Sequence, residues 1–321
     1  MRSFWLICAC LAVALAPAAA QSGGFDRPTA GFVFRAGSGA VRPLVGVPGA
    51  TYLGGPVLTG LRAAWIAPGG NWAFIITADH AAFVRGLSEN APSESPADGL
   101  IGAVDRVAWS RDGSVAVLCS TSGAQLQRVA LANGRVSADD PLDLTPWGAP
   151  TALAVDPSGR RIAFGVDGAG IYLTDGTKPP TLLVSLPRPA ATAFSDAGRL
   201  YTVDADTGRI LEFTPDLSPA DFAVVDAVDG VEFKPVGLAI SGGGRYVILT
   251  DRGSRTVRVY ETATRTLAET IQLDLAPAHT DRLSTGATYL LNRPHGAEWL
   301  LVLDASDMPR VYFVPAGDDV Q

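Results

Sequence analysis

Aspartates recur in this sequence directly after short apolar runs, at the points where those runs end. The residues in question are Asp79, Asp167, Asp204, Asp206, Asp251 and Asp304, with Asp307 an alternative to Asp304. If the run ends gather on one face, their carboxylates would form an acidic ring, and several convergent oxygens can hold a hard cation such as calcium. Aspartate is also favoured in turns because it accepts hydrogen bonds from downstream backbone N–H groups. Both a binding role and a structural role are therefore open.

Two arginines stand just before apolar runs, in equivalent places of consecutive segments. They are Arg62 and Arg106, and the corresponding positions elsewhere carry the small residues Ala152, Ala191 and Gly237. Beside an acidic ring, such cations either offset the repulsion among carboxylates or bind the carboxylate of a ligand through two hydrogen bonds. We therefore group Arg62 and Arg106 with the aspartates as candidate binding residues.

No motif for covalent, zinc or nucleotide chemistry is present. The three histidines, His80, His279 and His295, fall in predicted loops, where a solvated side chain is expected. Cys119 lies in an apolar run, which predicts a buried and unreactive thiol. The sequence has no Gly-x-Ser-x-Gly elbow, no His-Glu-x-x-His pair and no glycine loop that opens a helix. We therefore predict no catalytic residue.

The elements that must position these residues come from an internal repeat. Each copy has an apolar run, a Gly-rich or Asp-rich turn, a second apolar run, a polar turn and a third, alternating run. It can be read six times, and the first two runs of the copies are 63–66 and 72–77, 107–109 and 115–118, 152–155 and 162–166, 191–194 and 200–203, 237–240 and 246–250, and 288–291 and 299–303. Short runs rich in Val, Ile and Leu with glycine at the turns predict β-hairpins.

The spacing of the copies indicates the architecture. Their marker glycines are Gly70, Gly113, Gly159, Gly198, Gly243 and Gly296, which lie 39 to 53 residues apart. A period of about 40 to 50 residues is typical of four-stranded blades in a β-propeller. An all-β sandwich or a solenoid with similar turns is the alternative.

Three sequence segments resemble those of a known protein family. The segments from Val107 to Gly113 and from Leu153 to Gly159 resemble the "SPDG" hairpins of bacterial YVTN-type and WD-repeat-like propellers, as does the segment 246–260. The resemblance covers nearly the whole chain after its first residues, and it implies the architecture without implying an activity. The Gly-His and Trp-Asp pairs of true WD repeats are missing.

The two ends of the repeat predict how the ring closes. Runs at 31–34 and 41–45 are interpreted as the third and outer strands of a blade, and the chain ends after a third strand at 311–314. We therefore predict six four-stranded antiparallel blades closed by N- and C-terminal strands, with residues 30–47 completing the last blade. One strand is left over in this count, so seven blades are the alternative.

The first residues predict export. Arg2, the apolar stretch from Phe4 to Ala16 and the small residues Ala18 to Ala20 form a signal-peptide pattern. The stretch is short for a membrane span and Pro17 interrupts it, while the early cysteines do not fit a lipoprotein anchor. We divide the chain into a signal peptide, 1–20, and a single propeller domain, 21–321, secreted or periplasmic and not inserted in a membrane after cleavage.

The excess of acidic residues limits the classes of molecule that the protein is expected to bind. Without Arg2 the chain has 24 basic residues against 32 acidic ones, which argues against nucleic acid and anionic membranes. The leading hypothesis is a monomeric, non-enzymatic binding or scaffold protein without a cofactor, which uses one rim to bind a protein, peptide or glycan. The alternative is a calcium-dependent hydrolase resembling the gluconolactonase-type propellers, with an acidic central site. A pure spacer between domains is a third reading, although no second domain is visible.

Overall fold

The computed structural model describes residues 28–87, 92–226, 230–293 and 299–315. The predicted signal peptide and His295 lie outside the described residues. No helix in the described part of the chain is long and apolar enough to cross a membrane.

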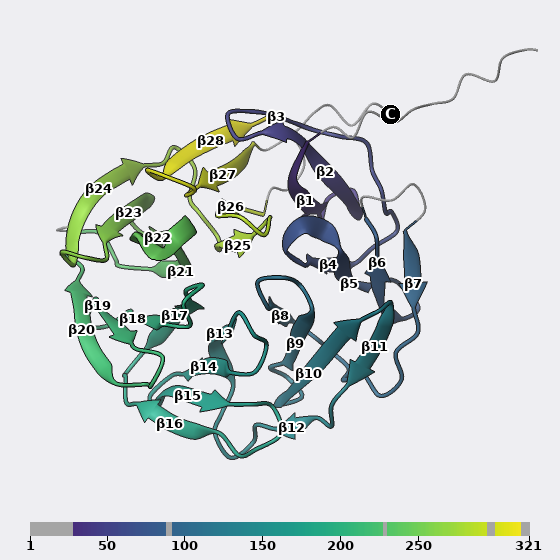
Figure 1. Ribbon diagram of the computed structural model, residues 1–321, viewed down its shortest axis with the longest axis horizontal. Coiled ribbons are helices and arrows are strands. Elements are labelled where there is room, and N and C mark those ends of the chain that lie inside the picture. The colour runs from purple at the N-terminus through teal and green to yellow at the C-terminus, as the bar shows by residue number, and fades with distance from the viewer. Residues whose placement is uncertain (1–27, 88–91, 227–229, 294–298, 316–321) are drawn as a thin grey trace, which may run out of the picture.

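Strands of the described residues form seven antiparallel sheets around one central axis, and Figure 1 shows them as blades of a ring. The predicted all-β propeller is therefore confirmed, with the seven blades that the sequence left as the alternative. The count of six is corrected.

The first three blades follow one another along the chain, and their strands run outward from the axis. Blade I contains β1 (Thr29–Arg35), β2 (Ala40–Val47) and β3 (Ala50–Leu53). Blade II contains β4 (Ala63–Ile66), β5 (Trp72–Ile76), β6 (Ala81–Arg85) and β7 (Ser93–Ser95). Blade III contains β8 (Arg106–Trp109), β9 (Val115–Ser120), β10 (Gln125–Ala132) and β11 (Arg135–Ala138), and β12 (Leu142–Asp143) also pairs with β10.

The remaining four blades have four strands each in the described residues. Blade IV contains β13 (Pro150–Val155), β14 (Ile162–Val166), β15 (Gly170–Thr174) and β16 (Thr181–Val184). Blade V contains β17 (Pro189–Phe194), β18 (Leu200–Asp204), β19 (Arg209–Phe213) and β20 (Pro219–Val224). Blade VI contains β21 (Pro235–Ile240), β22 (Tyr246–Asp251), β23 (Thr256–Glu261) and β24 (Thr266–Gln272). Blade VII contains β25 (Asp281–Arg282), β26 (Thr288–Leu290), β27 (Leu300–Asp304) and β28 (Arg310–Val314).

Glycine sets the turn between the first two strands of each repeat. Gly113 and Gly159 have φ of 70°, and Gly198 and Gly243 have φ of 76° and 74°. Glycine adopts this left-handed region without the steric cost that a Cβ would bring. In blades II and VI the turns include short 3₁₀ segments, η1 (Pro68–Gly70) and η2 (Gly242–Gly244). The predicted hairpin markers are confirmed for these described residues.

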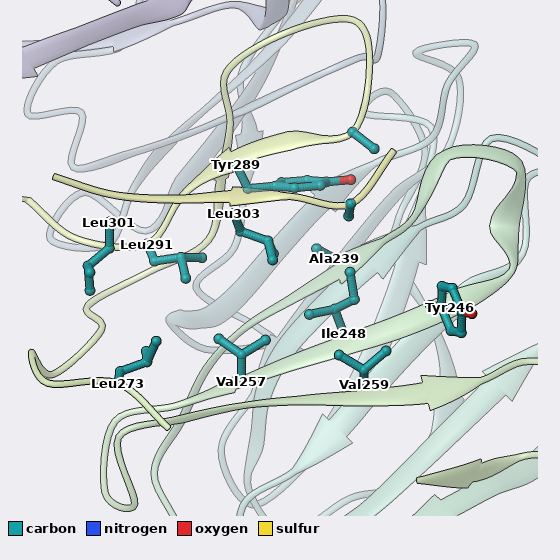
Figure 2. Close-up of a cluster of buried hydrophobic side chains, with 12 residues drawn as sticks. Ala239, Tyr246, Ile248, Val257, Val259, Leu273, Tyr289, Leu291, Leu301 and Leu303 are labelled. Atoms are coloured by element: carbon teal, nitrogen blue, oxygen red, sulfur yellow. The ribbon is translucent and has the colours of Figure 1, made fainter. Parts of the chain in front are cut away.

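Apolar side chains fill the spaces between neighbouring blades. The described residues form seven hydrophobic clusters, and each occupies one of the seven interfaces around the ring. Figure 2 shows the cluster between blades VI and VII, where Ile248 and Val257 face Leu301 and Leu303. Complete burial of such a side chain contributes about 1.5–3 kcal/mol, so the interfaces hold the blades together.

The closure of the ring differs from the prediction. Residues 30–47 do not complete the last blade, because β1 and β2 form a separate sheet with β3, blade I. Val33 and Leu44 pack against Leu290 and Val302 of blade VII, so side chains and not an exchanged strand close the ring.

The origin of the miscount lies in blade VII. Its inner strand, β25, has only two residues, and both are charged, so no apolar run marks it. The sequence predicts the runs 288–291 and 299–303 as first and second strands, but they correspond to β26 and β27, the second and third strands of the blade. The leftover strand of the sequence count has the same origin.

Two rims follow from this topology. We call the rim where inner strands begin the mouth rim; it carries Arg62, Arg106 and His279. The opposite rim, with the turns between first and second strands, is the hairpin rim and carries Gly113 and Gly198.

Candidate binding cavity

A cavity of about 540 Å³ occupies the axis of the ring. The inner strands of all seven blades contribute to its lining. Its wall includes the aromatic side chains of Phe34, Trp65, Trp109 and Phe194. Small-molecule and cofactor sites commonly have volumes of about 300–1,000 Å³ with mostly apolar walls and a few polar groups.

At the hairpin rim, charged side chains meet across the axis. Arg111 of blade III places its Nη1 2.7 Å from Oδ2 of Asp196 in blade V. Arg282 of blade VII lies 3.8 Å from the other oxygen of Asp196. Because blades III, V and VII are not neighbours in the ring, these contacts bridge the channel. We call Arg111, Asp196 and Arg282 the axial bridge.

Further hydrogen bonds fix the axial bridge in place. Arg111 Nε donates to the carbonyl oxygen of Thr285 at 3.2 Å. Arg282 donates to the Tyr289 hydroxyl at 2.8 Å, and that hydroxyl donates to the Ile240 carbonyl at 2.7 Å. Burial raises the pKa of Tyr289, so its hydroxyl keeps its proton for this bond. A hydrogen-bonded network therefore spans the hairpin end of the cavity.

At the mouth rim the cavity meets solvent beside blade VII. His279 Nδ1 lies 2.9 Å from Oδ2 of Asp281, and Nη2 of Arg293 lies 3.8 Å from the same oxygen. The side chains of Asp281 and Arg293 are 54% and 59% exposed, whereas that of His279 is 11% exposed. Arg62 of blade II lines the same cavity.

The charges around Asp281 favour its ionised form. Desolvation of the carboxyl inside the ring acts to raise its pKa, but the neighbouring His279 and the charge of Arg293 outweigh that effect. The pKa of Asp281 is therefore lowered, and its negative charge is offset by its neighbours.

Backbone contacts hold the segment that carries His279. The N–H groups of Ala278 and His279 both donate to the carbonyl oxygen of Leu291. The Thr280 hydroxyl donates to the hydroxyl of Thr250 in blade VI at 3.0 Å. A Cβ at Gly237 would lie 2.1 Å from Oγ1 of Thr280, so glycine permits this close approach.

The predicted acidic ring does not form. None of the predicted aspartates is among the described residues that line the cavity. Asp204 and Asp251 are completely buried, and each accepts hydrogen bonds from its own turn and from the residue just before the inner strand of its blade. Asp204 accepts from the N–H groups of Arg188, Asp206 and Thr207 and from the Thr207 hydroxyl. Asp251 likewise accepts from the N–H groups of Lys234, Gly253 and Ser254 and from the Ser254 hydroxyl. Their role is structural, as turn chemistry allowed.

The other predicted aspartates lie apart from one another. Asp79 and Asp167 are exposed on the mouth rim, and Asp206 forms an exposed ion pair of 2.9 Å with Arg188. Asp304 lies on the opposite rim, because it ends the third strand of blade VII and pairs with Thr288 and Arg310. The sequence placed it after a second strand, so its assignment to the mouth rim is corrected.

The two predicted arginines differ in their surroundings. Arg62 lines the cavity, whereas Arg106 is not among the described lining residues and donates from Nη1 to the Thr151 carbonyl at 2.7 Å. Within the described residues, no carboxylate forms an ion pair with Arg62. Sequence reasoning missed His279, Asp281 and Arg293, and the signal that could have found them is the polar run 279–282 where the repeat expects an apolar strand.

Other candidate groups for chemistry are inert or isolated. Burial raises the pKa of the Cys119 thiol to about 12, and the nearby Asp105 adds to the effect. His80 forms an exposed pair with Glu94 on blade II. In the part of the chain that the structure describes, no group of three or more His, Cys, Asp or Glu side chains lies close enough to hold a metal ion.

Comparisons with known proteins do not indicate an activity for this chain. No protein-family model matches the chain, and no curated protein matches it. The chain is similar to the crystal structure of a nidogen/laminin complex, with 14% identity over 75% of this chain and 92% of that chain and a TM-score of 0.49. It is similar to virginiamycin B lyase from Staphylococcus aureus, with 14% identity over 78% of this chain and 82% of that chain and a TM-score of 0.49. A catalytically inactive variant of that lyase with quinupristin gives 14% identity, the same coverage and a TM-score of 0.48. At this distance the similarity carries no argument about function, and no family model supports the YVTN-type resemblance specifically.

Replacement of Asp204 by alanine tests its structural role. The variant removes a buried carboxylate that accepts four hydrogen bonds, so we expect a loss of about 1.5–3 kcal/mol in the free energy of unfolding. Urea denaturation of Asp204→Ala and of the exposed control Asp206→Ala measures the difference, and the control should lose less than about 1 kcal/mol. Similar losses in the two variants would contradict the assignment.

Proposed function

We propose that this protein is an exported, monomeric, non-enzymatic binding protein, secreted or periplasmic, that takes part of a protein, peptide or glycan into its axial cavity from the mouth rim. The observation that carries the proposal is the cavity of about 540 Å³, bridged at the hairpin rim by Arg111, Asp196 and Arg282. The entrance for a ligand is then the mouth rim, past Arg62 and Arg293.

The construction of the cavity supports binding. Its wall is built from strands whose side chains pack between blades, so the shape is set by the ring and not by loose loops. Polar groups at the mouth lie on blades II and VII, which is how a rigid scaffold presents recognition residues. The described lining residues include no serine or cysteine nucleophile.

The calcium-dependent alternative finds less support. A hard-cation site needs several oxygen ligands that converge on one point. The predicted aspartates are instead distributed over both rims, and two of them are engaged by backbone N–H groups. The only two carboxylates among the described lining residues, Asp196 and Asp281, are each paired with basic side chains.

A blocked cavity provides the test. Ala63 is half-buried and lines the cavity next to Arg62, so Ala63→Trp should obstruct the mouth. Ala197 is exposed on the hairpin rim, and Ala197→Trp is the matched control. The parent and both variants are immobilised and exposed to cell-envelope extract, and retained molecules are identified by mass spectrometry. We expect a molecule that the parent and Ala197→Trp retain and Ala63→Trp loses by at least about tenfold.

Two results would contradict the proposal. One is equal retention by Ala63→Trp and the parent, which would place binding outside the cavity. The other is chemical conversion of the retained molecule by the parent, which would make the protein an enzyme. Circular dichroism of Ala63→Trp should match the parent, so that loss of binding is not loss of fold.

A further inference from the structure

The lining of the cavity is positively charged in an acidic protein. Four arginines and two aspartates are among its described residues, which gives a net charge of +2 with His279 neutral, whereas the whole chain has a formal net charge of −7. A cleft with one sign of charge and low-dielectric walls concentrates ligands of the opposite sign. The cavity is therefore suited to an anion.

The uncompensated cation lies at the mouth. Arg111 and Arg282 share Asp196, and Arg293 and His279 surround Asp281. Arg62 is exposed and has no carboxylate within 4.0 Å among the described residues. A guanidinium group can bind a carboxylate through two parallel hydrogen bonds.

The wall beside Arg62 is apolar, because Phe34 of blade I packs with Leu61 and Ala64 on either side of it. Every residue of β4 is half-buried, as are Val107 to Trp109 of β8, whereas all but one residue of β21 on the other side are buried. Trp65 and Trp109 line the deeper part of the cavity, at the hairpin ends of β4 and β8, whereas the half-buried Phe34 of blade I lies beside Arg62. An apolar group next to the anion would contact the Phe34 ring.

The backbone of the wall favours a peptide over a glycan. In the described residues each inner strand, such as β4 and β8, pairs on its outer side only, with β5 and β9 respectively. The other edge of β4 and of β8 faces the cavity, and no strand of the described residues pairs with it. An extended peptide pairs with such an edge by adding as a strand, and a neighbouring pocket then selects its side chains.

We propose that the cavity binds an extended peptide segment in which a carboxylate adjoins an apolar side chain, with Arg62 holding the carboxylate. The inference rests on the proposed function and names the ligand class of that same site. The carboxylate is either the C-terminal group of the peptide or the side chain of an aspartate or glutamate, and both present the same two oxygens to Arg62.

Peptide arrays distinguish these sources. The probe is a set of synthetic hexapeptides with every combination of the last two residues, made once with a free C-terminal carboxylate and once as C-terminal amides. Arg106→Gln is the matched control for Arg62→Gln, because Arg106 holds the equivalent place in the next blade and lies outside the described lining. Fluorescence anisotropy then gives dissociation constants for the best peptides with the parent, the two arginine variants and Ala63→Trp.

We expect the parent and Arg106→Gln to bind peptides with an apolar residue beside the carboxylate, and Arg62→Gln to bind them about 10-fold to 100-fold more weakly. Binding of the free acids alone identifies the C-terminal carboxylate, and binding of amides that contain aspartate or glutamate identifies the side chain. If amides without any carboxylate bind as tightly, or if Arg62→Gln binds like the parent, the inference is overturned. If Ala63→Trp nevertheless weakened the binding of those peptides, the proposed function would still be supported. Absence of peptide binding in all arrays, with binding to a glycan array, overturns the peptide assignment.

Discussion

A chain that begins at residue 54, and therefore lacks blade I, should not fold into a closed ring. Blade I contributes apolar side chains to two interfaces, one with blade VII through Val33 and Leu44 and one with blade II through Phe32 and Val41. Its removal exposes both neighbouring faces to water, and a domain has a stability of only about 5–15 kcal/mol to lose. We expect no sharp thermal transition and association of the exposed faces, which differential scanning calorimetry and size-exclusion chromatography measure.

A milder variant serves as its control. Leu44 is completely buried, so Leu44→Ala should fold and lose about 2–5 kcal/mol of the free energy of unfolding. If the chain from residue 54 instead melts as a monomer within a few degrees of the parent, six blades are able to close the ring, and the packing account of closure is wrong.

Glu212→Ala should cost about 3–5 kcal/mol of the free energy of unfolding, because it removes an acceptor that two side chains of blade V share with one side chain of blade VI. Oε1 of Glu212 lies 2.8 Å from Nη1 of Arg199 and accepts from the Tyr201 hydroxyl at 2.9 Å, and Oε2 lies 3.0 Å from Nη2 of Arg265. The Glu212 side chain is 7% exposed, so water cannot fully replace it. Asp221 is the control, since it pairs with Arg209 of the same blade but is 69% exposed.

Urea denaturation of the two variants provides the measurement. Asp221→Ala should lose less than about 1 kcal/mol, as exposed ion pairs do. A loss below about 1 kcal/mol for Glu212→Ala would show that its three partners find other acceptors, and the link between blades V and VI would then be unimportant for stability.

The repeat could be predicted because hairpins are local. The turns at Gly113, Gly159 and Gly198 need a left-handed residue, and the runs beside them alternate or stay apolar according to burial. The number of blades depended on β25, where the inner strand has two charged residues and no apolar run. A strand that faces the axis on one edge does not need a long apolar sequence, so hydrophobic periodicity does not detect it.

The site was less accessible to sequence reasoning. Asp204 and Asp79 occupy the same kind of position, yet one is buried under backbone donors and the other is exposed, and only the fold of the connecting segment decides between them. The pairing of His279 with Asp281 depends on where the short β25 lies against β26. The axial bridge joins residues of non-neighbouring blades, and no local sequence pattern predicts such contacts.

The axial bridge has a consequence for the order in which the molecule folds. In a linear array of repeats each unit contacts only its neighbours, and structure can grow from any point outward. Here Arg111 bonds to Thr285, a residue 174 positions later in the chain. The hairpin turns of blades III, V and VII can meet only after the intervening blades have curved the chain into a circle. The contacts of the axial bridge therefore form after the blades are in place. They must break before blade III, V or VII can separate from the axis.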